Sequence, residues 1–173
     1  MTNWDDIVAD LGPMVWRTLW RLLADRADVE ECFQETFVSA LKLSRRETVT
    51  SWPAALCTLA TARGMDRLRQ RYRRGNRARE QCGELDLPQH QLHDTASHSA
   101  GPVEQAVVAE LAVRLRLALA QLPERQAEVF YLYAIDGWTH RDIGEQLQMT
   151  ENAVGVTVHR ARQRLRQLLD DCQ

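Results

Sequence analysis

The sequence predicts an all-α protein of two small helical domains joined by a flexible linker. Apolar residues recur at intervals of three and four along most of the chain, and no stretch alternates convincingly as a strand. Between Gly75 and Pro102 this periodicity stops, and Gly, Asn, Gln, His, Ser and Pro dominate the composition. At 173 residues, 45% of them hydrophobic, the chain is long enough for two small cores. We therefore expect one domain over 1–78, a linker over 79–102 and a second domain over 103–173.

The first domain is predicted to begin with two helices. Apolar residues share one helical face over 7–22, and the Gly-Pro pair at 12–13 predicts a break or a restart near the first turns. A polar turn over 25–28 separates this helix from the next one. The second helix then keeps unbroken helical spacing over 29–43.

A third helix carries most of the positive charge of this domain. Ser51 and Pro53 fit an N-cap and a first-turn proline, after a loop over 44–51. Over 63–79 arginines crowd together with only Asp66 opposing them. Such a dense cluster beside an ordered helix favours nucleic-acid binding, and the alternative is a solvated helix end.

The second domain is predicted to contain further helices and no strand. One helix covers 103–122, and Pro123 opens another that ends at the Asp-Gly pair at 136–137. A short helix follows over 139–147. After a tight turn, the last helix covers 150–169, with the threonine at its start as the N-cap.

The last two helices have the layout of a helix-turn-helix. Ile143 and Leu147 on the short helix, and Val154 and Val158 on the long one, are spaced to face inward. In this motif the second helix enters the major groove with its N-terminal residues at base edges, and flanking cations contact phosphate. The candidates to face DNA are Asn152, Thr157, His159 and Arg160, and the candidates for backbone contact are Arg162, Arg164 and Arg166. The alternative is an ordinary helical hairpin with a charged face.

Composition and charge limit the other classes of function. The formal net charge of -2 hides a segregation, because acidic stretches over 25–35 and 80–110 flank the arginine cluster. No apolar run has membrane-spanning length and nothing signals export, so we expect a cytoplasmic protein. The sequence contains no distinct Ser/His/Asp arrangement, paired-carboxylate motif or phosphate-binding glycine loop. We therefore expect neither an enzyme nor a cofactor.

The four cysteines are widely scattered and form no CxxC pair. Cys32 and Cys57 fall on apolar helical faces, which favours reduced and buried thiols over disulfides. Cys82 lies near three linker histidines, His90, His93 and His98, but their spacing is not that of a zinc site. We therefore expect no metal.

Three stretches taken together resemble the extracytoplasmic-function group of sigma-70 family sigma factors, the bacterial promoter-recognition subunits. They read DVEECFQETFVSAL at 28–41, ATARGMDRLRQRYRR at 60–74, and LPERQ followed by the helix-turn-helix and HRARQRLR at 122–166. The resemblance covers nearly the whole chain. The third stretch is its most specific part, since the three motifs occur together and in order.

The resemblance implies a role for each stretch. The first would dock on the clamp helices of the RNA polymerase β′ subunit, through Asp28, Glu31, Gln34 and Glu35. The second would meet the −10 promoter element, through Arg63, Arg67, Arg71 and Arg74. The third would read the −35 element and lean on the β flap, with Asn152, Thr157, His159, Arg160, Arg162 and Arg164 as its DNA-facing residues. An anti-sigma factor is a further partner implied by the resemblance alone.

The sequence departs from the family pattern at two places, and one rival interpretation is open. Ala62 occupies the position where many relatives have an asparagine that helps to extract a −10 base, so the loop over 44–51 or Arg63 becomes the candidate for that role. Gly155 and Val156 stand where relatives often have basic or polar residues. The rival is a helix-turn-helix regulator that acts without joining polymerase. Whether the two domains pack together is open, and we expect a compact form to hide the DNA-facing helices.

Overall fold

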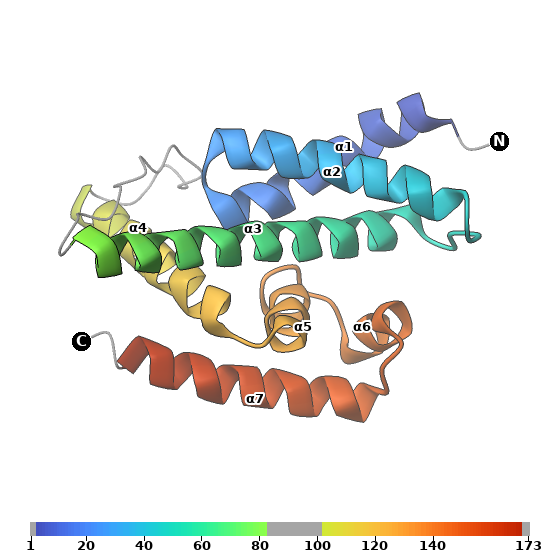
Figure 1. Cartoon of the computed structure of the whole chain (residues 1–173). Coiled ribbons are helices and arrows are strands. Elements are labelled where there is room, and N and C mark those ends of the chain that lie inside the picture. Colours follow the sequence, from blue (N-terminus) through green and yellow to red (C-terminus); the bar gives the residue numbers. More distant parts are fainter. Residues whose placement is uncertain (1–2, 83–101, 171–173) are drawn as a thin grey trace.

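The computed structural model describes residues 3–82 and 102–170, with side chains over 3–77 and 106–170, and it confirms the all-α class. All regular elements in these ranges are helices (Figure 1): α1 (Trp4–Leu23), α2 (Arg26–Ser44), α3 (Trp52–Cys82), α4 (Pro102–Gln121), α5 (Glu124–Ala134), α6 (His140–Leu147) and α7 (Glu151–Asp170). The order and type of the predicted elements are therefore confirmed.

The predicted break in the first helix is wrong, because α1 runs through Pro13 without interruption. Proline removes one backbone donor from a helix interior, so its neighbours must hold the helix together by packing. Gly12 is buried at this point, and the ring of Phe33 on α2 would lie 3.5 Å from a Cβ atom at this glycine. The close approach of α2 thus accounts for the glycine and supports the helix across the proline.

The second and third helices are longer than the sequence predicted. Asp25 caps α2 by accepting from the Asp28 N–H at 3.0 Å, so residues expected in a turn form the first turn of the helix. Ser51 caps α3 as predicted, accepting from the Ala54 N–H at 3.4 Å. α3 continues to Cys82 because arginine is a good helix former, and its last four residues fall within the range expected as linker. Residues 83–101 of that range lie outside the described residues, and its last residue, Pro102, begins α4.

The helices form two groups that pack on each other through α3. α1, α2 and α3 contact one another, α7 contacts α4, α5 and α6, and α3 also contacts α4, α5 and α6. Figure 1 shows α5 and α6 between α3 and α7. With the two groups packed in this way, the outer face of α7 is exposed. The expectation that packing would hide the DNA-facing helices is therefore wrong for α7.

Candidate nucleic-acid interface

α6 begins with a capping box that fixes its first turn. Thr139 Oγ1 accepts a hydrogen bond from the Asp142 N–H at 3.1 Å, and the Asp142 carboxylate accepts from the Thr139 N–H at 3.2 Å and from its hydroxyl at 2.6 Å. Each side chain thus satisfies a backbone donor that a helix N-terminus leaves unpaired. The start of the short helix at His140 agrees with the predicted element over 139–147.

We expect the charge of Asp142 to make the stability of this motif depend on pH. Hydrogen bonds from the Thr139 hydroxyl and then from its N–H lower the pKa of the Asp142 carboxyl. A lowered pKa contributes stability above the unfolded-state value, about 3.9, and the contribution is lost as pH falls through the folded-state value. Thermal unfolding should therefore separate wild type from Asp142→Asn most at neutral pH and least in acid. A difference in melting temperature that stays constant with pH would contradict this role.

The turn after α6 folds back on the helix before α7 begins. Gln148 adopts a left-handed conformation with φ of 54°, and the Met149 N–H donates to the Gly144 carbonyl at 2.8 Å. Thr150 then caps α7 by accepting from the Ala153 N–H at 3.2 Å, as predicted. The turn is hydrogen bonded on both sides, so it sets the angle between the two helices.

The residues on the buried and exposed faces of α7 are those that the sequence predicted. Its inner face is buried and consists of Val154, Val158, Ala161 and Leu165. On the other side Asn152, His159, Arg160 and Arg164 are exposed, and Thr157 is half-buried with its hydroxyl donating to the Ala153 carbonyl at 2.7 Å. A helix with one buried face and an exposed cationic face has the form needed to enter a groove.

Arg162 lies over an aromatic ring that sequence reasoning did not select. Its guanidinium lies over the Tyr133 ring, 5.3 Å from the centroid, and the Tyr133 and His140 rings are 4.9 Å apart. His140 also packs beside Gly155, 3.6 Å from where a Cβ atom would lie. Tyr133 and Arg162 are far apart in the sequence, so helical periodicity gives no signal of this contact. We infer that Tyr133 orients Arg162.

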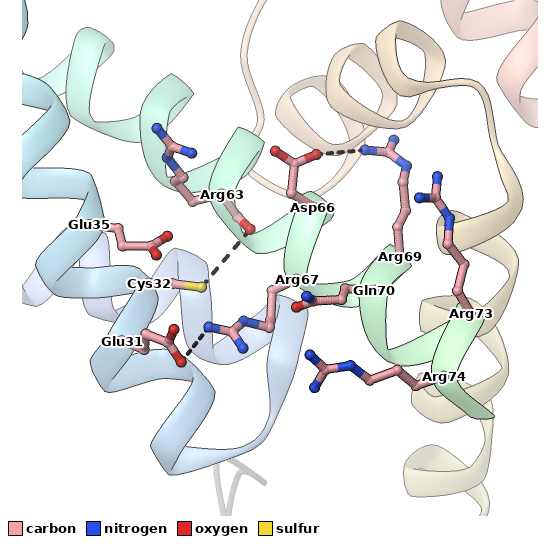
Figure 2. Close-up of a pocket in the computed structure, with 10 residues that line it drawn as sticks. All are labelled: Glu31, Cys32, Glu35, Arg63, Asp66, Arg67, Arg69, Gln70, Arg73 and Arg74. Carbon is pink, nitrogen blue, oxygen red and sulfur yellow. Dashed lines mark hydrogen bonds and ion pairs between the residues drawn. The ribbon is translucent and has the colours of Figure 1, made fainter. Parts of the chain in front are cut away.

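A polar cavity of about 530 Å³ lies between α2 and α3 (Figure 2). It brings together residues from the predicted polymerase-docking helix and from the arginine cluster. Its lining consists of Glu31, Cys32, Glu35, Arg63, Asp66, Arg67, Arg69, Gln70, Arg73 and Arg74. Arg63 is exposed and its guanidinium donates to the Ser39 hydroxyl at 3.1 Å. Arg74 is exposed at the rim of the same lining.

Four of the predicted site residues, two on α2 and two on α3, pair with one another between these helices. Arg67 lies 3.6 Å from Asp28 and forms a second ion pair with Glu31, which Figure 2 shows as a dashed line. Arg71 lies 2.8 Å from Asp28 and 3.8 Å from Asp25. The hydrogen bond to Glu31 raises the pKa of Arg67. These residues therefore join α2 to α3, whereas Gln34, Glu35, Arg63 and Arg74 are exposed and available to a partner.

The described residues contain no cluster of three or more His, Cys, Asp or Glu side chains arranged to hold a metal ion. The side chains of the sequence candidates, Cys82, His90, His93 and His98, lie outside the described residues. Cys32 and Cys57 are buried free thiols, as predicted. Within the described ranges, no helix has the length and apolar character required to cross a membrane.

Comparison with known proteins identifies the two helix groups. Residues 7–74 match the model of sigma-70 region 2, and residues 112–165 match that of sigma-70 region 4. The chain is 32% identical over 170 residues to the ECF RNA polymerase sigma factor ShbA of Streptomyces griseus, covering 95% of this chain and 86% of that protein. It is 27% identical over 173 residues to the RNA polymerase sigma factor CarQ of Myxococcus xanthus, covering 98% and 90%.

A solved structure has the same overall fold. It is the sigma factor RpoE in complex with the anti-sigma factor NepR from Bartonella quintana, which matches with a TM-score of 0.54, 17% identity and 96% coverage of each chain. The family models account for both helix groups, and the similarity to ShbA extends over nearly the full length of both proteins. The chain therefore belongs to the extracytoplasmic-function group of sigma-70 family RNA polymerase sigma factors.

Proposed function

We propose that this sigma factor divides promoter recognition between its two helix groups, with residues 1–78 as domain 2, 79–102 as a linker and 103–173 as domain 4. Domain 4 places α7 in the major groove of the −35 element and contacts the polymerase β flap. The observation that carries this proposal is the exposed row of Asn152, His159, Arg160 and Arg164 on a helix whose opposite face is buried. Arginine and asparagine are well suited to base edges, and further cations to phosphate.

Domain 2 is proposed to contact both polymerase and the −10 element. The exposed side chains of Gln34 and Glu35 on α2 present a polar surface for the β′ clamp helices, and Glu31 lies beside them. Arg63 and Arg74 are the exposed cations of α3 that we assign to the −10 strand. Arg67 and Arg71 contribute by holding α2 against α3, and Asp28 is their shared partner.

The protein acts by binding and not by catalysis, in our proposal, and it works in the cytoplasm, where core polymerase and promoter DNA are found. A solved sigma factor of the same fold carries a bound anti-sigma factor, NepR. An anti-sigma factor is accordingly a candidate partner for this chain as well.

Footprinting of the polymerase complex on a promoter that depends on this protein tests which domain contacts which promoter element. We expect Arg160→Ala to remove protection of the −35 element and leave protection at −10, because only domain 4 loses a base contact. Arg63→Ala should have the converse effect. Arg114→Ala is the matched control, since Arg114 pairs with Glu110 on α4 and belongs to neither of the two assigned sets of residues. Loss of both protected regions in the Arg160 variant, or no loss at −35, would contradict the assignment.

A further inference from the structure

An exposed valine lies in the row of α7 side chains that we assign to the major groove. Val156 is 42% exposed, whereas Val154 and Val158 on the same helix are buried. Val156 follows Asn152 by four residues and precedes Arg160 by four, a spacing that places the three side chains on one side of the helix. It therefore lies within the groove-facing row and not beside it.

Neither burial nor helix propensity accounts for a valine at this position. Valine forms helices less readily than alanine, because its branched side chain loses rotamer freedom in a helix. Gly155, the residue before it, is a still poorer helix former. An isolated exposed valine has no meaning by itself, since such residues are common on protein surfaces. The place of Val156 between a candidate base-reading asparagine and a candidate base-reading arginine is what carries the argument.

The residues on either side of Val156 do not supply a hydrogen-bond donor to a base in its place. Gly155 has no side chain. Thr157 is half-buried, and its hydroxyl donates to the Ala153 carbonyl at 2.7 Å. The proton of that hydroxyl is therefore engaged by the helix backbone. Over 155–157, the side chain presented to a base edge is the apolar one of Val156.

The major groove of DNA offers one apolar group, the C5 methyl group of thymine. The other base-edge groups there are hydrogen-bond donors and acceptors. Valine can satisfy neither kind, and covering a polar group without replacing its hydrogen bond to water costs free energy. Contact with a thymine methyl group instead removes apolar surface from water on both sides, and burial of one such group corresponds to about fourfold in affinity.

We propose that Val156 is a specificity-determining residue that contacts the C5 methyl group of a thymine in the −35 element. Asn152 lies about 6 Å from it along the axis of α7, which corresponds to about two base pairs of B-form DNA. Asparagine is best suited to adenine. The thymine should therefore lie within about two base pairs of the adenine that Asn152 reads. This inference rests on the proposed function, because only a helix in the major groove meets that methyl group.

Removal of single methyl groups from the DNA tests the proposal. Holoenzyme assembled from core polymerase and the full chain first selects duplexes from a pool randomised over the −35 region. Each thymine of a selected duplex is then replaced in turn by deoxyuridine, which keeps the base pair but lacks the C5 methyl group. We expect at least one replacement to weaken binding of the wild-type holoenzyme by about three- to fivefold. At that position, 5-methylcytosine should be bound more tightly than cytosine by a similar factor.

Val156→Ala tests whether this side chain recognises the methyl group. Alanine keeps the helix, since it is the better helix former, but its side chain does not extend as far toward the bases. We expect the affinity ratio between the thymine and deoxyuridine duplexes to fall below about twofold. Val113→Ala is the matched control, because it truncates another exposed valine, on α4, and should leave the ratio unchanged. Arg160→Ala should weaken binding of both duplexes and also keep the ratio.

The outcomes separate this inference from the proposed function. If no thymine of the selected sites depended on its methyl group, or if Val156→Ala kept the wild-type ratio, the inference would be overturned while sequence selection at −35 stood. If the holoenzyme selected no common sequence over the −35 region, the proposed function would be contradicted, and this inference with it.

Discussion

Replacing Gly144 by alanine is expected to destroy −35 recognition. A Cβ atom at this position would lie 2.6 Å from the carbonyl oxygen of Met149, which is backbone and has no freedom to rotate away. The turn between α6 and α7 would have to move, and with it the hydrogen bond from the Met149 N–H to the Gly144 carbonyl. Overpacking of this kind costs about 1–3 kcal/mol. Binding of a −35 duplex, measured by fluorescence anisotropy, should fall more than the loss of stability alone explains.

Gly155→Ala is the matched control for this variant. A Cβ atom there would lie 3.6 Å from His140, which is ordinary van der Waals contact. Removing a glycine from the interior of α7 should stabilise domain 4 by up to about 1 kcal/mol. The account would be wrong if Gly144→Ala bound DNA as wild type does, or if Gly155→Ala disrupted folding as severely.

Leu19→Ala is expected to destabilise both helix groups together. Leu19 is 0% exposed in the cluster that includes residues of α1 to α5 and α7. Truncation of a buried leucine typically costs about 2–5 kcal/mol, through lost burial and the cavity that remains. Because the core is continuous, amide hydrogen exchange should accelerate in peptides from α5 and α7 as well as in α1.

Val8→Ala is the control for this second variant, since Val8 lies on the same helix and is 40% exposed. A surface change of this kind should alter the free energy of unfolding by less than about 0.5 kcal/mol. If hydrogen exchange in Leu19→Ala accelerated only in α1–α3, the two helix groups would fold independently. That result would contradict a core shared by both groups.

The helix-turn-helix was predictable because its signals are local in the sequence. Thr150 as a cap, the turn before it and the apolar spacing of Val154 and Val158 all lie within a few residues of one another. The structure confirms each of them. The break at Pro13 was predicted wrongly for the opposite reason, since the packing of Phe33 beside Gly12 is a tertiary contact that periodicity does not encode.

The pairing of site residues and the contact between domains were not predictable from the sequence. Arg67 and Asp28 lie on different helices, and only the packing of α2 on α3 brings their charges within 3.6 Å. Tyr131 and Thr18 are 113 residues apart, and Thr18 contributes a backbone carbonyl that every residue possesses. Side-chain types predict which faces are buried, but they do not specify which faces meet.

Transcription in vitro from a pool of genomic promoters, with purified core polymerase and with or without this protein, tests the central claim most directly. The account predicts start sites that require the protein, share sequence at −35 and −10, and weaken when Arg160 is replaced by alanine. If the folded protein bound DNA but no start site depended on it, the chain would act as a DNA-binding regulator independent of polymerase, and the sigma-factor account would be contradicted.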